Sequence, residues 1–421
     1  MHQNSIRIEY SNPQAVFYPG TNVDGVVHLE LKESIKARSL KIVIHGRAYT
    51  HWEVRRSRTK STTHTENYTA PYSATVIFVD CESIAWAPAY GAKQVLQAGI
   101  YRFPFLFTLP LKCAPSFEGF YGYIRYMVKV VLDRPWRFNK TDKRLFTVVP
   151  MLDLNLMPEV AVPVREVTVK NLGVVLFRHG KVTVEWEISK RGYVPGEAVV
   201  VNAVVKNDTS KNFVKATMKL LEISKYVAYE HSCTFHQESF RRNECGHNSR
   251  EQRRKLATGE QDICIEKKSE GNVQLYLQVP PTVPTFNSCA IISVEYIVEV
   301  KFKTMSTFNG DIESCFPITV GTVPVNNAKY FTQPTAANLD MPCTSSVAPT
   351  APPLEISSSY ATWSGTNVHP PPPPSYEESI NGVAGTTLDT DNMESFIPRY
   401  PFYSTLCGVE KSVYNGNSLK I

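Results

Sequence analysis

Residues 101–132 read YRFPFLFTLPLKCAPSFEGFYGYIRYMVKVVL, and this stretch decides the fold class. Large apolar side chains occupy every second position from Tyr101 to Leu109 and again from Ile124 to Leu132. Successive side chains of a β-strand point to opposite faces, so a period of two predicts strands with one buried face. Pro104 lacks the backbone donor that a central strand needs, which predicts an edge strand or a bulge in the first run.

The same alternation continues along the rest of the first 325 residues. It returns in residues 182–188, 199–205, 273–279 and 294–302, each run rich in valine, isoleucine, leucine and aromatic residues. Many short strands separated by Gly, Pro and Asn are typical of β-sandwiches, whereas sustained helical periodicity is scarce. The sequence therefore predicts an all-β protein.

A central block of the first half is repeated in the second half. Leu109-Pro110…Pro115-Ser-Phe117…Ile124-Arg-Tyr126 matches Val279-Pro280…Pro284-Thr-Phe286…Val294-Glu-Tyr296, about 170 residues later. Tyr18-Pro19-Gly20 likewise matches Tyr193-Val-Pro195-Gly196. Two blocks in one order predict a duplicated domain, while chance similarity between turn-rich segments is the alternative. We place the domains at residues 1–157 and 164–325, with a linker near Pro158 to Pro163.

Length and composition agree with two domains and a tail. At 421 residues the chain exceeds one ordinary domain, and a net charge of +6 permits anionic partners without requiring nucleic acid. The N-terminus has no apolar run of signal-peptide length, and no stretch is apolar enough to span a bilayer. Nine scattered cysteines favour a reducing compartment over a disulfide framework. We expect a cytoplasmic protein whose membrane contact is peripheral.

Residues 326–421 differ in character from the rest. They are rich in Pro, Ser, Thr and Ala, and they contain a proline run at 370–374. Such a composition buries too little apolar surface to offset the entropy of ordering, which predicts a disordered, proline-rich C-terminal tail.

The sharpest motif in this tail is Pro373-Pro374-Ser375-Tyr376. A proline run already favours polyproline II, so docking it costs little further entropy. WW domains hold two adjacent prolines in an aromatic groove and place the tyrosine ring in a neighbouring pocket. The motif therefore predicts a WW-domain partner; the alternative is a stiff linker in which the tyrosine is incidental.

Two basic segments are candidate contacts for cargo or other anions, and we expect both to be loops. The first contains Arg55, Arg56 and Arg58, and the second begins with Arg241 and Arg242 and continues from Arg250 to Lys255. Charge-assisted hydrogen bonds would suit phosphorylated receptor tails or acidic lipid headgroups. Solvated loops that keep the chain soluble are the alternative. No aromatic interleaving or helix-turn-helix pattern favours nucleic acid.

The sequence predicts no enzyme, metal or cofactor. It contains no G-x-S-x-G, H-E-x-x-H, phosphate-binding glycine loop or kinase signature. Cys233, His236, Cys245 and His247 have a spacing that matches no zinc site. Cys245 stands near several arginines that would lower its pKa, so it is a candidate reactive thiol, with an ordinary loop cysteine as the alternative.

The order of these blocks resembles the arrestin-domain-containing proteins, or α-arrestins, over about residues 5 to 325. The resemblance is carried by Tyr18-Pro-Gly, His51-Trp-Glu53, Gly99-x4-Pro104-Phe-x-Phe107-x-Leu-Pro110, Ser116-Phe-Glu-Gly119, Leu132-Asp-Arg-Pro-Trp136, Gly192-Tyr-Val-Pro-Gly196 and Pro317-Ile-x-x-Gly-Thr322. Phe396-Ile-Pro-Arg-Tyr400-Pro and the Pro373–Tyr376 motif belong to the same pattern.

The resemblance implies two tandem immunoglobulin-like, arrestin-type β-sandwiches. It also implies an adaptor that brings WW-domain HECT-type ubiquitin ligases to membrane receptors or transporters, so that ubiquitinated cargo is endocytosed from the plasma membrane to endosomes. Many relatives carry two Pro-Pro-x-Tyr copies, but Pro352-Pro353-Leu354 is followed here by Glu355. One relative binds thioredoxin through a cysteine, so a redox scaffold that acts through Cys245 is the alternative function.

Overall fold

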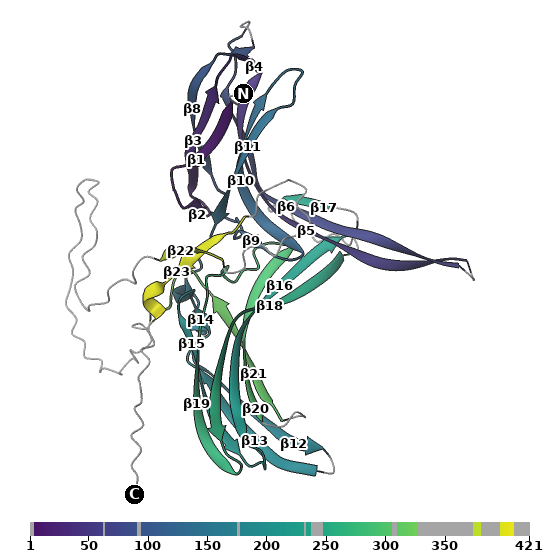
Figure 1. Cartoon of the computed structure of the whole chain (residues 1–421), viewed down its shortest axis with the longest axis vertical. Helices are drawn as coiled ribbons and strands as arrows, with labels where there is room; N and C mark the ends of the chain where they lie inside the picture. Colours follow the sequence, from purple (N-terminus) through teal and green to yellow (C-terminus); the bar gives the residue numbers. More distant parts are fainter. Residues whose placement is uncertain are drawn as a thin grey trace, which may run out of the picture.

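The computed structural model describes residues 4–61, 64–90, 94–174, 177–230, 233–236, 247–304, 310–326, 374–379 and 396–407. In these ranges the regular elements are β-strands and three short 3-10 turns, so the all-β prediction is confirmed. The strands form two elongated lobes, one above the other in Figure 1, and a long hairpin projects from their junction. No helix in the described ranges is both long and apolar enough to cross a membrane.

The N-terminal lobe is a sandwich of two sheets. Its smaller sheet has the order β1-β3-β8, which makes β8 an edge strand, as Pro104 predicts. The apolar positions of the 124–132 run are buried between the sheets. The strands of this lobe are β1 (Ser5–Tyr10), β2 (Val16–Phe17), β3 (Asn22–Leu31), β4 (Ile35–Lys36), β5 (Ser39–Ser61), β6 (His64–Trp86), β7 (Val95–Leu96), β8 (Gly99–Thr108), β9 (Phe117–Glu118), β10 (Gly122–Asp133) and β11 (Lys140–Val148).

The C-terminal lobe is a second sandwich, in which a β12-β13-β15-β19 sheet faces β14-β21-β20-β16. Trp186 is buried between them, with its ring centroid 4.7 Å from that of Phe302. The strands are β12 (Val164–Val174), β13 (Phe177–Ile188), β14 (Gly192–Tyr193), β15 (Ala198–Asn207), β16 (Phe213–Tyr229), β18 (His247–Ile265), β19 (Ser269–Gln278), β20 (Ile292–Thr304) and β21 (Ile312–Val320). The strand β17 (Cys233–His236) follows β16 along the chain but pairs with β6 of the N-terminal lobe.

The two lobes share one sheet. The short turns η1 (Leu154–Leu156) and η2 (Pro158–Val160) connect them along the chain. Tyr229 of β16 pairs with Ser73 of β6, which joins the inner sheets of both lobes into a 12-stranded sheet. The lobes are therefore attached through backbone pairing as well as through side chains.

The duplicated sequence blocks build the same corner twice. The hydroxyl of Tyr126 donates to the carbonyl of Ala114 at 2.7 Å, and that of Tyr296 donates to Val283 at 2.6 Å. The Gly20 amide donates to Leu109 at 3.0 Å, and the Gly196 amide donates to Val279 at 2.7 Å. Equivalent residues thus make equivalent bonds in both lobes.

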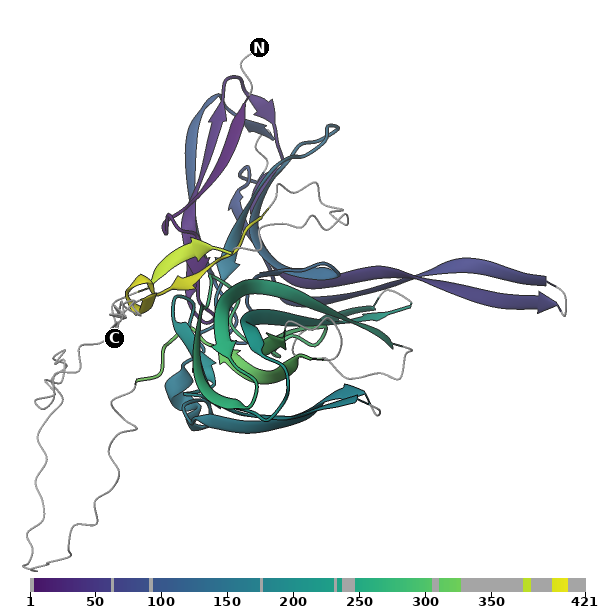
Figure 2. The same ribbon diagram turned by 60° about the horizontal axis from the view of Figure 1, so that its bottom comes forward.

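The basic segments lie mainly on paired strands, which corrects the expectation of loops. Residues 55–61 belong to β5, where it pairs with β6 in the long hairpin that Figure 2 shows in profile. Residues 250–255 belong to β18, which pairs with β16. A two-stranded ribbon that faces solvent on both sides can have polar side chains at every position. A run of charged residues is therefore compatible with such a strand as well as with a loop.

The tail prediction lies largely outside the described residues, but two of its segments are described. Residues 374–379 and 396–407 contain β22 (Ser375–Glu378), β23 (Arg399–Phe402) and the turn η5 (Ser404–Cys407). β22 and β23 pair as an antiparallel hairpin against the junction of the lobes, in yellow in Figure 1. These two segments therefore differ from the expected disorder, because aromatic side chains of the tail are buried on the lobes.

Candidate functional site at the junction of the two lobes

The two copies of the repeated Pro-Ser/Thr-Phe block meet at the junction. The ring centroids of Phe117 and Phe286 lie 6.0 Å apart, with the ring planes at 66°. On the N-terminal side, Ser116 exchanges bonds of 2.9 Å with Val148 through its amide and hydroxyl. On the C-terminal side, Thr285 does the same with Val320 at 2.8 and 2.9 Å. The duplicated corner thus supplies both halves of one interface.

The tail hairpin is anchored to both halves. The hydroxyl of Tyr400, a fully buried residue, donates to the Ser116 carbonyl of the N-terminal lobe at 2.8 Å. The hydroxyl of Tyr403 donates to the Thr322 carbonyl of the C-terminal lobe at 2.7 Å. The Tyr403 amide adds a bond of 3.0 Å to Pro195. Burial raises the pKa of Tyr403 to about 12 and raises that of Tyr400 further, so both remain neutral donors.

The described part of the Pro-Pro-Ser-Tyr motif lies on this hairpin. The Tyr376 ring packs against the hydrophobic core, and its hydroxyl contacts the hydroxyl of Tyr18. Ser375 is exposed and Pro374 is half-buried, while Pro373 lies outside the described residues. Burial also raises the pKa of Tyr376. The motif's tyrosine is therefore held on a lobe and is only partly accessible.

The two repeated Pro-Gly turns hold the two outer tyrosines of the tail. Tyr18, which contacts Tyr376, precedes Pro19 and Gly20, and Pro195, which accepts from Tyr403, precedes Gly196. Gly196 has a φ of +97°, and a Cβ there would collide with the Tyr403 backbone. A glycine is required at this turn for both reasons.

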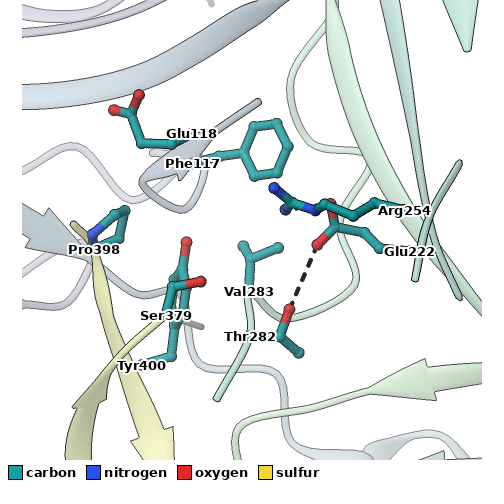
Figure 3. Close-up of a pocket in the computed structure, with 9 residues that line it drawn as sticks. All are labelled: Phe117, Glu118, Glu222, Arg254, Thr282, Val283, Ser379, Pro398 and Tyr400. Atoms are coloured by element: carbon teal, nitrogen blue, oxygen red, sulfur yellow. Dashed lines mark hydrogen bonds and ion pairs between the residues drawn. The ribbon is translucent and has the colours of Figure 1, made fainter. Parts of the chain in front are cut away.

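A small cavity lies where the lobes and the tail meet. Figure 3 shows it lined from the N-terminal lobe by Phe117 and Glu118, from the C-terminal lobe by Glu222, Arg254, Thr282 and Val283, and from the tail by Ser379, Pro398 and Tyr400.

Two ion pairs flank this cavity. Arg254 contacts the buried Glu222 at 2.7 Å, and Arg125 binds Glu118 through two bonds of 2.6 and 2.9 Å. Burial raises the pKa of Glu222, while the guanidinium of Arg254 opposes the rise. Each ion pair lies within one lobe, and charges buried in pairs are sensitive to the loss of either partner, so each wall of the cavity depends on its own pair.

The arrangement is suited to holding a peptide segment. Its polar side chains are used in ion pairs and in bonds to backbone carbonyls, and the described residues lining the cavity include no cysteine or histidine. Within the described ranges, no group of three or more His, Cys, Asp or Glu could hold a metal ion. The lobes hold the tail in two ways: their backbone carbonyls accept hydrogen bonds from tyrosine hydroxyls of the tail, and the aromatic rings of these tyrosines are buried.

The other candidate residues from the sequence lie elsewhere or outside the description. Arg56 lies on β5 and pairs with Glu230 at 3.0 Å, and Arg55 adjoins it. The backbone of Arg58 belongs to β5, but its side chain is outside the described residues, as are Arg241, Arg242 and Cys245. Among the cysteines that are described, burial raises the pKa of Cys113 and Cys289 to about 11, so neither is a reactive thiolate at neutral pH.

Sequence reasoning missed the residues that receive the tail. Tyr18 stood out only as part of a repeated turn, and Glu222 carried no signal at all. Tyr400 was present in the Phe396–Pro401 pattern, but nothing local to that pattern indicates burial. Arg254 belongs to the basic segment that the sequence predicts as a loop and a candidate anion contact, yet it contacts a carboxylate of this protein that is only 2% exposed.

Comparison with known proteins gives a consistent result. Residues 6–155 match the family model described as the arrestin (or S-antigen) N-terminal domain, and residues 178–325 match the corresponding C-terminal domain. Arrestin domain-containing protein 17 of Caenorhabditis elegans is 29% identical over 75% of this chain and 70% of its own length. Human arrestin domain-containing protein 4 is 29% identical over 73% of this chain and 68% of its own length. Human arrestin domain-containing protein 1 is 25% identical over 96% of this chain and 79% of its own length.

Proposed function

This chain belongs to the arrestin-domain-containing proteins, and we propose that it is a non-catalytic adaptor that acts in membrane trafficking. In this proposal the lobes bind a membrane receptor or transporter, and the tail recruits a WW-domain HECT-type ubiquitin ligase. Ubiquitination of the cargo then leads to its endocytosis, with the protein moving from the cytoplasm to the plasma membrane and endosomes.

One observation carries the ligase half of this proposal. Ser375 is exposed and Pro374 and Tyr376 are half-buried, at the start of a hairpin whose strands pair with each other and with neither sandwich. A WW domain takes the prolines and the tyrosine ring together, so it must draw Tyr376 away from Tyr18. Binding of the motif to the WW domain therefore competes with its docking against Tyr18. The affinity for the ligase is set by the difference in free energy between these two states.

The basic hairpin is the proposed contact for cargo. Arg55 and Arg56 lie where β5 and β6 leave the N-terminal lobe, beside Tyr68 and Thr69 of the opposite strand. Arg58, and Arg241 and Arg242 in the segment before β18, extend the positive charge along the sequence. An acidic or phosphorylated segment of a receptor tail is the matching ligand for such guanidinium groups.

Calorimetry with a purified WW domain tests the recruitment step. The full chain is expected to bind, and the double variant Pro374→Ala, Tyr376→Ala is expected to lose binding by about 100-fold, since both docking elements are removed. The matched control is Pro353→Ala, Tyr360→Ala, which makes the same two replacements in the tail outside the motif and should leave the affinity unchanged. Equal affinity of the wild type and the motif variant would overturn the recruitment mechanism.

A second measurement compares the WW-domain affinity of the free motif with that of the motif docked against Tyr18. A synthetic peptide spanning residues 368–380 is expected to bind the WW domain more tightly than the full chain does, because it has no contact with Tyr18 to break. The variant Tyr18→Ala should bring the full chain toward the affinity of the peptide.

A further inference from the structure

The turn between β10 and β11 exposes two aromatic side chains at one end of the molecule. Trp136 is 97% exposed and Phe138 is 95% exposed. The first residue of β10 pairs with Thr50, whose hydroxyl donates to Val227 of the C-terminal lobe, so this end of β10 is at the junction. The last residue of β10, Asp133, pairs with Ser39 at the opposite end of the strand. The turn therefore lies at the end of the N-terminal lobe that points away from the junction, near the top of Figure 1.

Internal bonds fix the shape of this turn. The Arg134 amide donates to the Asn139 side chain at 3.2 Å, and the Arg134 guanidinium donates to the Phe138 carbonyl at 3.0 Å. Trp136 has a φ of +59°, a conformation that favours glycine or asparagine and is strained for a bulky residue. A tryptophan kept in a strained and fully exposed position is costly to the fold, which points to a role outside it.

The aromatic rings are surrounded by positive charge. Arg38, Arg134 and Arg137 line the same surface hollow as Trp136 and Phe138, together with Asn139 and a single carboxylate, Asp133. Asp133 lies 3.8 Å from Arg38, which offsets one charge. Arg134 and Arg137 therefore place positive charge beside the two exposed aromatic rings.

We propose that this turn is a contact site for an anionic membrane surface. Tryptophan is favoured at the level of the lipid headgroups, where its ring is apolar and its N–H is hydrated. Neighbouring arginines are attracted to acidic headgroups, and the two effects add. A projecting tip of two rings is too small to form a stable protein interface by itself, whereas it is sufficient to dip into a headgroup layer.

The site would orient the molecule on the membrane independently of the tail motif. The turn and the β22–β23 hairpin lie on different parts of the molecule, so failure of one proposal does not remove the other.

Vesicle sedimentation tests this proposal on the full chain. Wild-type protein is expected to co-sediment with vesicles of phosphatidylcholine and phosphatidylserine, and to bind pure phosphatidylcholine at least about tenfold more weakly. The double variant Trp136→Asn, Phe138→Ser should lose about tenfold or more of the binding. Asparagine tolerates the φ of position 136, so the melting temperature of this variant should not fall.

Two matched controls sharpen the result. Arg137→Gln should weaken binding and reduce its dependence on salt, whereas Arg165→Gln, an exposed arginine of the C-terminal lobe, should not. Leu106→Ser, which removes an apolar side chain that is 62% exposed on β8, should also leave binding unchanged. Equal binding by the wild type and the Trp136→Asn, Phe138→Ser variant, or equal binding to neutral and acidic vesicles, would overturn the proposal. Absence of any vesicle binding would do so as well.

Discussion

Individual tyrosines hold the tail to the lobes, each in a different way. Tyr376 is half-buried against Tyr18, Tyr400 is fully buried on the N-terminal lobe, and Tyr403 bonds to the C-terminal lobe. A buried phenol contributes both apolar area and one hydrogen bond, so its ring and its hydroxyl can be tested separately.

The Tyr400 hydroxyl can be removed without removing its ring. Tyr400→Phe leaves the Ser116 carbonyl without this donor and should destabilise the docked tail by about 1–2 kcal/mol. Hydrogen exchange of the amides of Arg399, Tyr400 and Phe402 should become faster. Tyr276→Phe, which removes an exposed hydroxyl on β19, is the control; equal exchange in the Tyr400 variant and the wild type would contradict the assigned role.

Glu222 should make stability depend on pH. Burial raises its pKa above the unfolded value, so above about pH 4.5 the folded state keeps a proton that the unfolded chain has lost. This contribution favours folding at low pH and is lost as pH rises through the folded pKa. Glu222→Gln should remove that part of the pH dependence of the melting temperature above about pH 4.5.

The control for this titration is Glu295→Gln. Glu295 lies on β20 with a largely exposed carboxylate paired with Lys225, so its replacement should leave the pH profile close to that of the wild type. An unchanged profile in Glu222→Gln would mean that another group is responsible.

At the scale of elements, the β22–β23 hairpin depends on the turn beneath it. The turn brings the Gly196 backbone so close to Tyr403 that no side chain fits between them. A hairpin of two short strands is marginal alone, so its order comes from this packing rather than from its own ladder.

Gly196→Ala should therefore release the C-terminal end of the hairpin. Strain of about 1–3 kcal/mol at a positive φ, added to the collision with Tyr403, favours the undocked tail. Trypsin cleavage after Arg399 should become about tenfold faster or more. Gly259→Ala on β18, where a Cβ has room, is the matched control, and equal cleavage in both variants would refute the prediction.

At the scale of the whole molecule, the tail acts as a bridge between two sandwiches. The lobes also meet through the Tyr229–Ser73 pair and the Phe117–Phe286 contact, so they do not depend on the tail alone. The tail adds a further connection, which contains the motif proposed to bind the ligase.

Deleting residues 396–407 should loosen the arrangement of the lobes. It removes the buried side chains of Tyr400 and Tyr403, which together account for about 3–6 kcal/mol of apolar burial. The melting temperature should fall, and small-angle scattering should show a larger radius of gyration. Deleting residues 408–421 instead is the control; identical melting and scattering of both truncated chains would argue against the bridge.

The sequence alone determined the all-β class and the two sandwiches. Alternation of apolar residues is a local property, and burial of one strand face follows from it directly, as in Ile124 to Leu132. The repeated blocks around Tyr126 and Tyr296 also build equivalent corners because the same residues meet the same local geometry in each lobe.

Only the tertiary structure decided where the charged and aromatic groups of the site lie. Tyr18 and Tyr376 meet across 358 positions, and Arg254 pairs with Glu222 across two strands rather than facing solvent. The first contact depends on how the tail packs against the N-terminal lobe, and the second depends on the register in which β18 pairs with β16. No short-range pattern encodes either of them. A proline-rich composition describes the average tendency of a segment to stay unfolded, and a few buried tyrosines are sufficient to override it locally.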